Sequence, residues 1–487
     1  MISLKELIRA AYPDYPDAAA LPEVPVSGLE CDSRRVRKGF LFVAIRGKKL
    51  DGRQFIQEAI GRGASAVVTD NLEKPDGPVP FLLVPDSRSA ASKLAAAFYG
   101  NPSEKLTVIG LTGTNGKTTV SYLIEHLLQK ENKKVGVIGT VNYRFDGQEE
   151  PSKETTPGPL KSQEILSEIL KAGLSHAVME VSSHALDQDR VSDIRFSAAA
   201  FTNLTQDHLD YHGTMEHYFE SKAKLFTGLG PETTSVLNAD DAWAMRLAKS
   251  VKNKIITYGL KGDADLKAER LTMSVEAMQF TLKEGGKTVP VTLPLLGRHN
   301  VSNALGALGI MKALNFPLER SLEHLRDFKG VPGRLERLNE GQNFSVLIDF
   351  AHTPDALENA LRSMHDYKSK RLLTVFGCGG DRDKGKRPKM GRIAADWSDF
   401  VYVTSDNPRS EDPEMIAREI CSGFPAQYNR YAVVLDRHKA IRRALMDARE
   451  GDLVLLAGKG HEQTQVIGDH VFAFSDRHEA EKILHGH

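Results

Sequence analysis

The chain has 487 residues, which at about 150 residues per domain predicts roughly three domains. Lys plus Arg and Asp plus Glu each number 64, so the formal net charge is zero, which argues against a nucleic-acid-binding or polybasic membrane protein. A hydrophobic fraction of 41% with 26% charged residues is typical of a folded globular chain. No apolar run approaches the ~18 residues that a membrane span requires. The three cysteines form neither a disulfide framework nor a CxxC metal site. We therefore expect a soluble, cytoplasmic, multidomain protein.

The first hundred residues alternate short apolar runs with amphipathic stretches. The predicted elements are helices at 55–62 and 87–98 and strands at 64–69 and 81–84. Residues 99–105 (YGNPSEK) are rich in turn formers and predict a linker. This pattern favours a small α/β domain.

A predicted βαβ unit follows at 105–140. The strand 105–111 (KLTVIGL) is buried, and the strand 135–138 ends the unit. Between them, apolar residues recur with the spacing of one helix face, namely Val120, Leu123, Ile124, Leu127 and Leu128.

The first strand of this unit runs directly into a glycine-rich loop that opens the helix. The loop is Thr112-Gly113-Thr114-Asn115-Gly116-Lys117-Thr118-Thr119. Its N–H groups and the helix N-terminus favour a phosphate, while Lys117 would reach the β/γ-phosphates and the Thr118 hydroxyl would ligate Mg²⁺. One departure from the GxxxxGK[ST] pattern is Leu111, where that pattern has glycine. The loop predicts ATP binding but does not choose between a kinase, a switch GTPase, a motor and a ligase, although a base-reading NKxD element of GTPases is absent.

The middle of the chain carries acidic, histidine and lysine candidates. Glu180 ends an apolar run and suits Mg²⁺, although a solvated carboxylate at a strand end is the alternative. His208 and His212 are spaced i, i+4, but the segment lacks the Glu of HExxH, which disfavours a zinc protease. Lys222 and Lys224 alone look like ordinary surface lysines of a helix.

After a Gly- and Pro-containing boundary at 329–334 the alternation becomes regular and predicts a doubly wound parallel sheet. The predicted strands are 344–349, 372–376, 400–404, 432–435 and 453–457. Polar loops at 377–383, 405–409 and 458–462 follow three of them, and ligands of such folds bind at the carboxyl ends of strands. A dinucleotide site is disfavoured because GCGGDRD lacks the GxGxxG spacing. Arg382 and Arg409 suit carboxylates, and Glu462 suits an ammonium group.

Eight motifs, in this order along the chain, resemble those of the Mur ligases. They are TGTNGKTT, MEVSSHAL, FTNLTQDHLDYH, GRHNVSNALGA, DFAHTPDAL, GCGGDRDKGKRP, DNPRSEDP and GKGHE, and the resemblance covers essentially all 487 residues. It implies an α/β chain of three domains: a small UDP-binding domain at 1–100, a central phosphate-loop ATPase domain at 101–332 and a Rossmann-like, doubly wound domain at 333–487.

The resemblance also implies a reaction. Mur ligases join an amino acid to a carboxylate with ATP, through an acyl phosphate, and release ADP and phosphate. Within the family the chain is most similar to the members that add the third residue of the peptidoglycan stem peptide to UDP-MurNAc-L-Ala-D-Glu. The expected partners are small-molecule substrates only, with no nucleic acid, no membrane insertion and a monomeric state.

Residues for ATP and metal are implied by the same likeness. The ATP set is Gly113, Thr114, Asn115, Gly116, Lys117, Thr118, Thr119, Asn300, Arg334 and Asp349. Thr118 and Glu180 would hold one Mg²⁺ and His208 a second. Lys222 matches the lysine that is carbamylated in this family.

The nucleotide-sugar acceptor is expected along the first two domains. The family places it beside Ser33 and near Thr155, Thr156, Ser182, Gln188 and Arg190. Glu154 departs from relatives that carry Asn before the Thr pair. Between residues 31 and 53 there are eight Lys or Arg (34, 35, 37, 38, 46, 48, 49 and 53) against Asp32 and Asp51, a local charge of +6 that suits a pyrophosphate. A solvated basic face is the alternative.

The likeness assigns the amino acid to the C-terminal loops. The residues are Arg382, Asp406, Asn407, Pro408, Arg409, Gly458 and Glu462. Members that use meso-diaminopimelate carry DNPR, as this chain does at 406–409, whereas those that use L-lysine lack the Arg because lysine has no distal carboxylate. Meso-diaminopimelate is therefore expected. The alternatives are the same ligase using L-lysine, a folylpolyglutamate-synthetase-like ligase, and a non-catalytic nucleotide switch.

Overall fold

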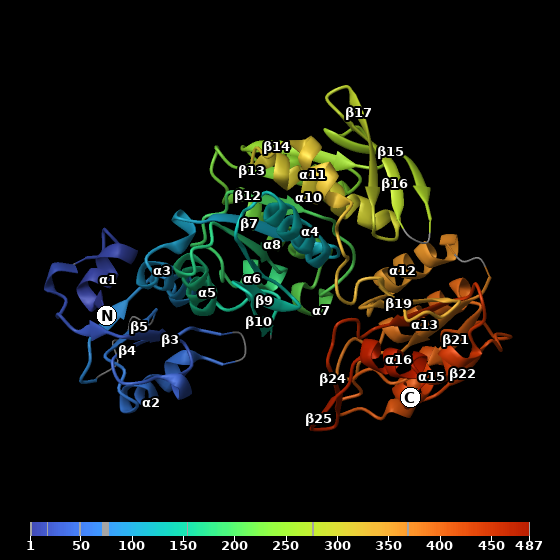
Figure 1. Ribbon diagram of the computed structural model, residues 1–487. Coiled ribbons are helices and arrows are strands. Elements are labelled where there is room, and N and C mark those ends of the chain that lie inside the picture. The colour runs from blue at the N-terminus through green and yellow to red at the C-terminus, as the bar shows by residue number, and fades with distance from the viewer. Residues whose placement is uncertain are drawn as a thin grey trace. The chain divides into compact units, whose positions relative to one another are not determined.

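The computed structural model describes residues 2–16, 18–47, 50–70, 77–152, 154–274, 277–367 and 370–486. The chain divides into two compact units, coloured mainly blue to green and yellow to red in Figure 1. One comprises Met1–Tyr258 with Gly306–Leu318, and the other comprises Gly259–Leu305 with Glu319–His487. In the described part of the chain, no helix has both the length and the apolar character needed to cross a bilayer.

The N-terminal part of the first unit is a small α/β layer structure. Its parallel sheet has the order β3 (Gly28–Glu30), β4 (Phe40–Val43), β5 (Ala66–Thr69) and β6 (Phe81–Leu83). Helices α1 (Leu4–Ala11) and α3 (Ser87–Phe98) share one apolar core with the sheet, and α2 (Ile56–Gly61) lies in a second core. A short pair, β1 (Ile2–Ser3) with β2 (Pro25–Val26), precedes the sheet. The predicted strands and helices of this region are confirmed, with ends that differ by one or two residues.

The central sheet of the first unit holds the phosphate loop. Its strands are β7 (Thr107–Thr112), β8 (Val135–Ile138), β9 (Asn142–Phe145), β10 (Gln148–Pro151), β11 (His176–Glu180), β12 (Ala198–Phe201), β13 (Thr234–Asn238) and β14 (Lys254–Gly259). They lie in the order β10-β9-β8-β11-β7-β12-β13-β14. Strands β8, β11, β7, β12, β13 and β14 are parallel, and β9 and β10 form an antiparallel hairpin at the edge. The βαβ unit predicted at 105–140 is confirmed as β7, α4 and β8. Its two strands are parallel but not adjacent, because β11 lies between them.

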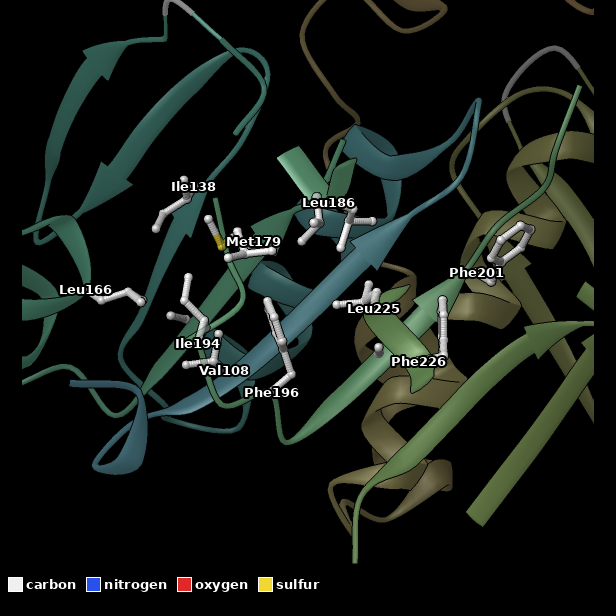
Figure 2. Close-up of a cluster of buried hydrophobic side chains, with 14 of the residues drawn as sticks. Val108, Ile138, Leu166, Met179, Leu186, Ile194, Phe196, Phe201, Leu225 and Phe226 are labelled. Atoms are coloured by element: carbon white, nitrogen blue, oxygen red, sulfur yellow. The ribbon is translucent and has the colours of Figure 1, made fainter. Parts of the chain in front are cut away.

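Helices connect these strands and cover the sheet. They are α4 (Lys117–Lys130), α5 (Pro159–Lys171), α6 (Ser183–Asp187), α7 (Leu209–His212), α8 (Met215–Thr227) and α9 (Ala242–Ala248). The five apolar residues of the predicted helix face all have no exposed surface. Figure 2 shows part of the core, to which β7 contributes Val108, β11 contributes Met179 and α8 contributes Leu225. This packing holds the carboxyl ends of the strands, and the loops that follow them, in place.

The second unit contains an antiparallel meander and the predicted doubly wound sheet. The meander is β15 (Leu266–Met273), β16 (Met278–Glu284) and β17 (Lys287–Leu293). The chain passes from one unit to the other within helix α10 (Arg298–Ala313), after Leu305, and again within α11 (Leu318–Leu325), after Leu318.

The C-terminal sheet has the order β18-β19-β23-β20-β21-β22. The strands are β18 (Glu336–Leu338), β19 (Ser345–Asp349), β20 (Leu372–Phe376), β21 (Phe400–Val403), β22 (Tyr431–Val433) and β23 (Leu453–Ala457), and all but β18 run parallel. Helices α12 (Pro354–Tyr367), α13 (Lys386–Trp397) and α14 (Pro413–Cys421) pack in one row, and α15 (Arg437–Asp447) packs against α16 (Asp476–Leu484). The predicted parallel sheet is confirmed.

The elements not predicted from the sequence include strands β3, β4, β12, β13 and β14, the hairpin β9–β10, the meander β15–β17 and the hairpin β24 (Thr464–Ile467) with β25 (His470–Ala473). All residues of β10 and of β25 are exposed. Strands with no buried face lack the apolar alternation on which the prediction depends.

Candidate active site

The phosphate loop adopts the strand–loop–helix form that its sequence predicts. It links β7 to α4, whose N-terminus is Gly116 with a positive φ of 89°. Gly113 has a φ of 143°, and a Cβ there would lie 1.9 Å from Thr202 Oγ1. Glycine is therefore required at 113 both by the backbone conformation and by the neighbouring side chain.

Two lysines converge on one carbonyl oxygen of this loop. Lys117 Nζ donates to Gly113 O at 2.8 Å and to Thr114 O at 3.0 Å. Lys222 Nζ, from helix α8, donates to the same Gly113 O at 2.8 Å and lies 4.6 Å from the Tyr218 ring centre. The loop thus gathers two amines where the β- and γ-phosphates of a nucleotide are expected.

Lys222 is not a surface residue. Only 1% of Lys222 is exposed, so the prediction from its spacing alone, that it is an ordinary surface lysine, is wrong. The prediction is confirmed for Lys224, whose side chain is half exposed. Burial, with Lys117 adding repulsion, lowers the pKa of Lys222 well below its usual value, while Asp207 acts in the opposite direction. A neutral amine is the nucleophilic form of lysine.

The two predicted oxygen ligands for Mg²⁺ are brought together behind the loop. Thr118 Oγ1 donates to Glu180 Oε2 at 3.0 Å, and Glu180 is 1% exposed. Thr140, which lies in none of the sequence motifs, donates to the same carboxylate through its hydroxyl at 2.9 Å and its backbone N–H at 3.1 Å. Hard oxygen donors of this kind suit Mg²⁺.

His208 lies at the start of α7 with a positive φ of 53°. Its Nε2 lies 3.3 Å from Asp207 Oδ2, and its ring centre is 4.8 Å from that of His184. Burial lowers the pKa of His208, opposed by Asp207 and assisted by Lys117 and Lys222. A neutral imidazole keeps a lone pair for a metal. Within the described residues, no group of three or more His, Cys, Asp and Glu side chains is arranged to hold a metal by itself.

Five of the residues expected to bind the acceptor lie close together in the first unit. Thr155 Oγ1 lies 3.2 Å from the Thr140 hydroxyl oxygen, and Thr156 Oγ1 accepts from the Ser182 N–H at 2.9 Å. Arg190 donates to Gln188 Oε1 and to the Thr156 carbonyl. One further partner of Arg190 is unexpected: its Nη1 also donates to the Glu154 carboxylate.

Ser33 lies in the N-terminal domain, and its hydroxyl donates to Glu58 Oε2 at 2.8 Å. In the basic stretch, Arg34 and Arg53 form ion pairs with Asp32 and Asp51, two residues before each. The predicted local charge of +6 already subtracts Asp32 and Asp51, and Lys48 and Lys49 lie outside the described residues.

The remaining ATP candidates lie in the second unit. Asp349 ends β19 and accepts backbone N–H groups of Leu335 at 2.7 Å and Ala351 at 2.8 Å. Burial raises the pKa of this carboxyl, and the nearby Arg334 opposes the rise. The Arg334 guanidinium lies 4.7 Å from the Phe350 ring centre. Asn300 is buried on α10, where its side chain donates to Leu296 O and accepts from Asn303.

The three polar loops of the C-terminal sheet follow β20, β21 and β23, which are neighbours in the sheet, as the sequence predicts. Arg409 has a φ of 52°, and its Nη1 donates to Gly380 O at 2.8 Å. The Arg409 backbone also pairs with β24, because its N–H donates to Val466 O and its carbonyl accepts from Gly468. The loop after β20 and the hairpin β24–β25 therefore both hold Arg409 in place.

The other candidates for the amino acid surround Arg409. Asn407 is buried and donates to Glu462 Oε2 at 2.9 Å. Asp406 is buried, and a Cβ at Gly458 would lie 2.9 Å from its Oδ2. The carbonyl of Pro408 lies so close to Gly380 that a Cβ there would be 1.9 Å away. Arg382 is exposed and donates to the Asp381 carbonyl.

Lys459 is a further member of this cluster and was not among the residues predicted to bind the amino acid. It has no exposed surface, and its Nζ contacts Asn407 and Glu462. Its position inside the GKGHE motif could have marked Lys459 as a site residue. A lysine in a polar loop is usually solvated, however, so the sequence alone did not predict its burial.

Comparison with known proteins supports one family throughout the chain. Sequence models described as the Mur ligase family catalytic domain, the Mur ligase middle domain and the Mur ligase glutamate ligase domain match residues 25–99, 111–311 and 333–460. The UDP-N-acetylmuramoyl-L-alanyl-D-glutamate--2,6-diaminopimelate ligase of Gloeobacter violaceus is 44% identical over 470 residues, which is 96% of each chain. That of Geobacillus thermodenitrificans is 45% identical over 458 residues, which is 93% of each chain.

Solved structures agree. A UDP-N-acetylmuramoyl-L-alanyl-D-glutamate--2,6-diaminopimelate ligase has a TM-score of 0.72 and 34% identity, with 98% of each chain covered. The MurF ligase of Thermotoga maritima in complex with ADP has a TM-score of 0.63 over 96% of this chain and 99% of its own. At 21% identity this second likeness concerns the fold alone. On the strength of the full-length match to the first group, this chain belongs to the Mur ligase family of ATP-dependent, amide-bond-forming ligases.

Proposed function

We propose that the protein adds meso-diaminopimelate to the D-Glu carboxylate of UDP-MurNAc-L-Ala-D-Glu during peptidoglycan precursor synthesis. The proposal is carried by a buried Thr118–Glu180 pair behind a phosphate loop, in a chain 44% identical over 96% of its length to a ligase of that name. ATP is a substrate that is split into ADP and phosphate.

In the first step a carboxylate oxygen of the acceptor attacks the γ-phosphorus of ATP, and ADP leaves from an acyl phosphate. Little covalent chemistry falls to the protein here, so its task is to position the groups and stabilise charge. The N–H groups at 116–119, at the N-terminus of α4, would hold the phosphates, because the N–H groups of Thr114 and Asn115 donate to Asn203. Lys117, now bonded to loop carbonyls, is near enough to exchange them for phosphoryl oxygens.

Thr118 and Glu180 would hold Mg²⁺, and His208 would serve a second ion. Bound there, the cation neutralises negative charge on the phosphoryl oxygens. Thr140 donates two hydrogen bonds to Glu180 and so orients its carboxylate. Orientation of a ligand by neighbouring donors is a common requirement of metal sites.

We also propose that Lys222 is carbamylated by CO₂. The support is its burial, the lowered pKa that favours the neutral amine, and the adjacent Lys117. Carbamylation replaces a potential cation with an anion, which removes repulsion from Lys117 and supplies oxygens beside the phosphate loop.

In the second step the amine of the amino acid attacks the acyl phosphate, and phosphate leaves through a tetrahedral intermediate. Ser33, Thr155, Thr156, Ser182, Gln188 and Arg190 are proposed to bind the acceptor. Arg382, Asp406, Asn407, Pro408, Arg409, Gly458 and Glu462 are proposed to bind meso-diaminopimelate. Arg409 would pair with its distal carboxylate and Glu462 with an ammonium group, which matches the zwitterionic end of this amino acid.

ATP and UDP-linked sugars are cytoplasmic metabolites, so we place the reaction in the cytoplasm. We propose that the monomer is active, which light scattering at assay concentration would test. The proposed ATP residues Asn300, Arg334 and Asp349 belong to a different compact unit from the phosphate loop.

Phosphate release measured with purified UDP-MurNAc-L-Ala-D-Glu, Mg-ATP and a panel of amino acids tests the proposal. We expect release with meso-diaminopimelate and a mass shift of the acceptor by one diaminopimelate residue. Preference for L-lysine would replace the proposed substrate, and no release with any amino acid would overturn the ligase assignment for this acceptor.

A further inference from the structure

A fully buried ammonium group lies beneath the proposed amino-acid site. Lys459 Nζ donates to Glu462 Oε2 at 2.7 Å and to Asn407 Oδ1 at 3.2 Å, and the residue has no exposed surface. By contrast, the Glu462 side chain is 32% exposed. The pair therefore has a buried cationic end and a carboxylate that reaches solvent.

Asn407 closes this arrangement into a triangle. Its Nδ2 donates to Glu462 Oε2 at 2.9 Å, and its Oδ1 accepts from Lys459 and, at 3.0 Å, from the Val466 N–H of β24. Because Lys459 and Val466 both donate, the amide oxygen of Asn407 must face them and its NH₂ must face Glu462. Lys459 thus contacts both proposed ligand groups, and it shares the orientation of the Asn407 amide with the Val466 N–H.

The main chain of the two loops is braced separately. Arg437 is buried, pairs with Asp476 through two hydrogen bonds, and donates to the carbonyls of Ser405 and Ala457. These carbonyls lie at the starts of the loops that carry Asn407 and Glu462. Loss of Lys459 would therefore disturb side chains more than the path of the loops.

We propose that Lys459 is a positioning residue for the amino acid: it holds the Glu462 carboxylate and the Asn407 amide in the geometry that receives an ammonium group of the substrate. This inference rests on the proposed function. Burying an ammonium group is costly, and an apolar replacement of a buried ion pair is often neutral or stabilising. Stability alone is therefore a weak reason for Lys459 to be there, and a role in orientation accounts for its two partners.

The test compares Lys459→Met, whose unbranched side chain is one atom shorter and carries no charge, with Lys459→Gln, Glu462→Gln and the Lys459→Met/Glu462→Gln double variant. KM and kcat are measured for meso-diaminopimelate, ATP and the acceptor, and the melting temperature of each variant is recorded. The matched control is Lys439→Met. Lys439 is a lysine of the same unit in an exposed pair with Asp436, with 73% of its side chain exposed.

We expect Lys459→Met to raise KM for meso-diaminopimelate about ten- to a hundredfold, as for loss of a charge-assisted contact, with KM for ATP and the acceptor within about twofold of wild type. Lys459→Gln, which retains a donor, should lie between Lys459→Met and wild type. If Lys459 acts through Glu462, the double variant should resemble Glu462→Gln within about twofold, because the two effects are then not additive. Lys439→Met should match wild type.

Additive effects in the double variant, or equal changes in all three KM values, would overturn the inference and leave Lys459 a structural residue. If Lys459→Met does not fold, the same comparison is made with Lys459→Gln. A wild-type protein that ignores meso-diaminopimelate would overturn the proposed function instead, so the two failures are distinguishable.

Discussion

Lys117 and Lys222, which are 105 positions apart in the chain, donate hydrogen bonds of 2.8 Å to the same oxygen, the carbonyl of Gly113. Two ammonium groups so close together repel each other, and burial of Lys222 adds to the cost of its charge. The arrangement favours either a neutral Lys222 or its conversion into an anion. This relationship is the physical basis for the proposed carbamate.

Replacing Lys222 by Ala is expected to abolish nearly all ligation, because the variant cannot form the carbamate. Short carboxylates such as acetate should restore part of the rate by occupying the vacated space as anions. Wild-type enzyme assayed in CO₂-depleted buffer should lose activity and regain it with bicarbonate. Lys224→Ala, in the same helix but half exposed, should remain active. An active Lys222→Ala variant that ignores both additives would contradict the proposed carbamate.

Lys117→Ala should lower kcat by orders of magnitude, because a cation at the phosphate loop acts on charge that develops in the transition state. The melting temperature should change little, since Lys117 is partly exposed and its two carbonyl partners belong to its own loop. The exposed Lys130→Ala, at the other end of α4, is the control and should behave as wild type. A near-normal rate of ligation by Lys117→Ala would contradict the proposal that this loop binds the phosphates of ATP.

Glu154 and Arg190 predict an effect on the acceptor. The Glu154 carboxylate accepts a hydrogen bond from Arg190. A carboxylate of the acceptor that binds Arg190 would have to displace Glu154. Glu154→Gln removes the competing charge, so KM for the acceptor should fall with kcat nearly unchanged. The side chain of Glu154 is 56% exposed, and exposed pairs contribute only about 0–1 kcal/mol, so the expected decrease is at most about fivefold.

Steady-state kinetics with varied UDP-MurNAc-L-Ala-D-Glu provide the measurement for Glu154→Gln. The exposed Glu150→Gln on β10 is the matched control and should leave KM unchanged. A rise in KM for the acceptor would mean that Glu154 itself contributes to binding.

Arg409→Ala should lower kcat/KM for meso-diaminopimelate about ten- to a hundredfold, because a bidentate guanidinium–carboxylate pair is worth about 1.5–3 kcal/mol. L-Lysine has no distal carboxylate, so its low kcat/KM should change much less. The ratio of kcat/KM for meso-diaminopimelate to that for L-lysine should therefore decrease. Arg409→Lys should not restore activity, since an ammonium group lacks the forked geometry. Arg418→Ala, an exposed arginine of α14, is the control. Equal losses with both amino acids would show that Arg409 is not the selector.

The stability of the first unit should fall as the pH is lowered from about 6.5 to about 4. Burial lowers the pKa of His176 from 6.5 to about 4, with Lys133 assisting, and the residue is 8% exposed at the start of β11. In this window the unfolded chain binds a proton at His176 that the folded chain does not, so the free energy of unfolding decreases as pH falls. The loss from this group is on the order of 2–3 kcal/mol at pH 4.

Urea unfolding at pH 7.5 and pH 4.5 measures this effect. His176→Gln should lose less stability between the two pH values than wild type, whereas the exposed His217→Gln should lose as much. An identical pH dependence in wild type and His176→Gln would contradict the role assigned to burial.

Local sequence patterns predict the helices, strands and loops on which the site is built. The phosphate loop, the buried face of α4 and the parallel strands at 372–376 and 453–457 follow from glycine positions and apolar periodicity, which act over a few residues. The placement of three polar loops at one edge of the C-terminal sheet also followed, because parallel strands present their carboxyl ends to the same side.

Only the tertiary structure decided which distant side chains meet. The position of β11 between β7 and β8, the burial of Lys222 against Gly113, the Glu154–Arg190 pair and the triangle around Lys459 all join segments that no local pattern relates. Charged residues such as Lys222 and Lys459 are usually solvated, so their burial is set by the packing of whole elements and by the partners that packing supplies. Contacts of this kind depend on strand order and helix placement, which short-range spacing in a sequence does not specify.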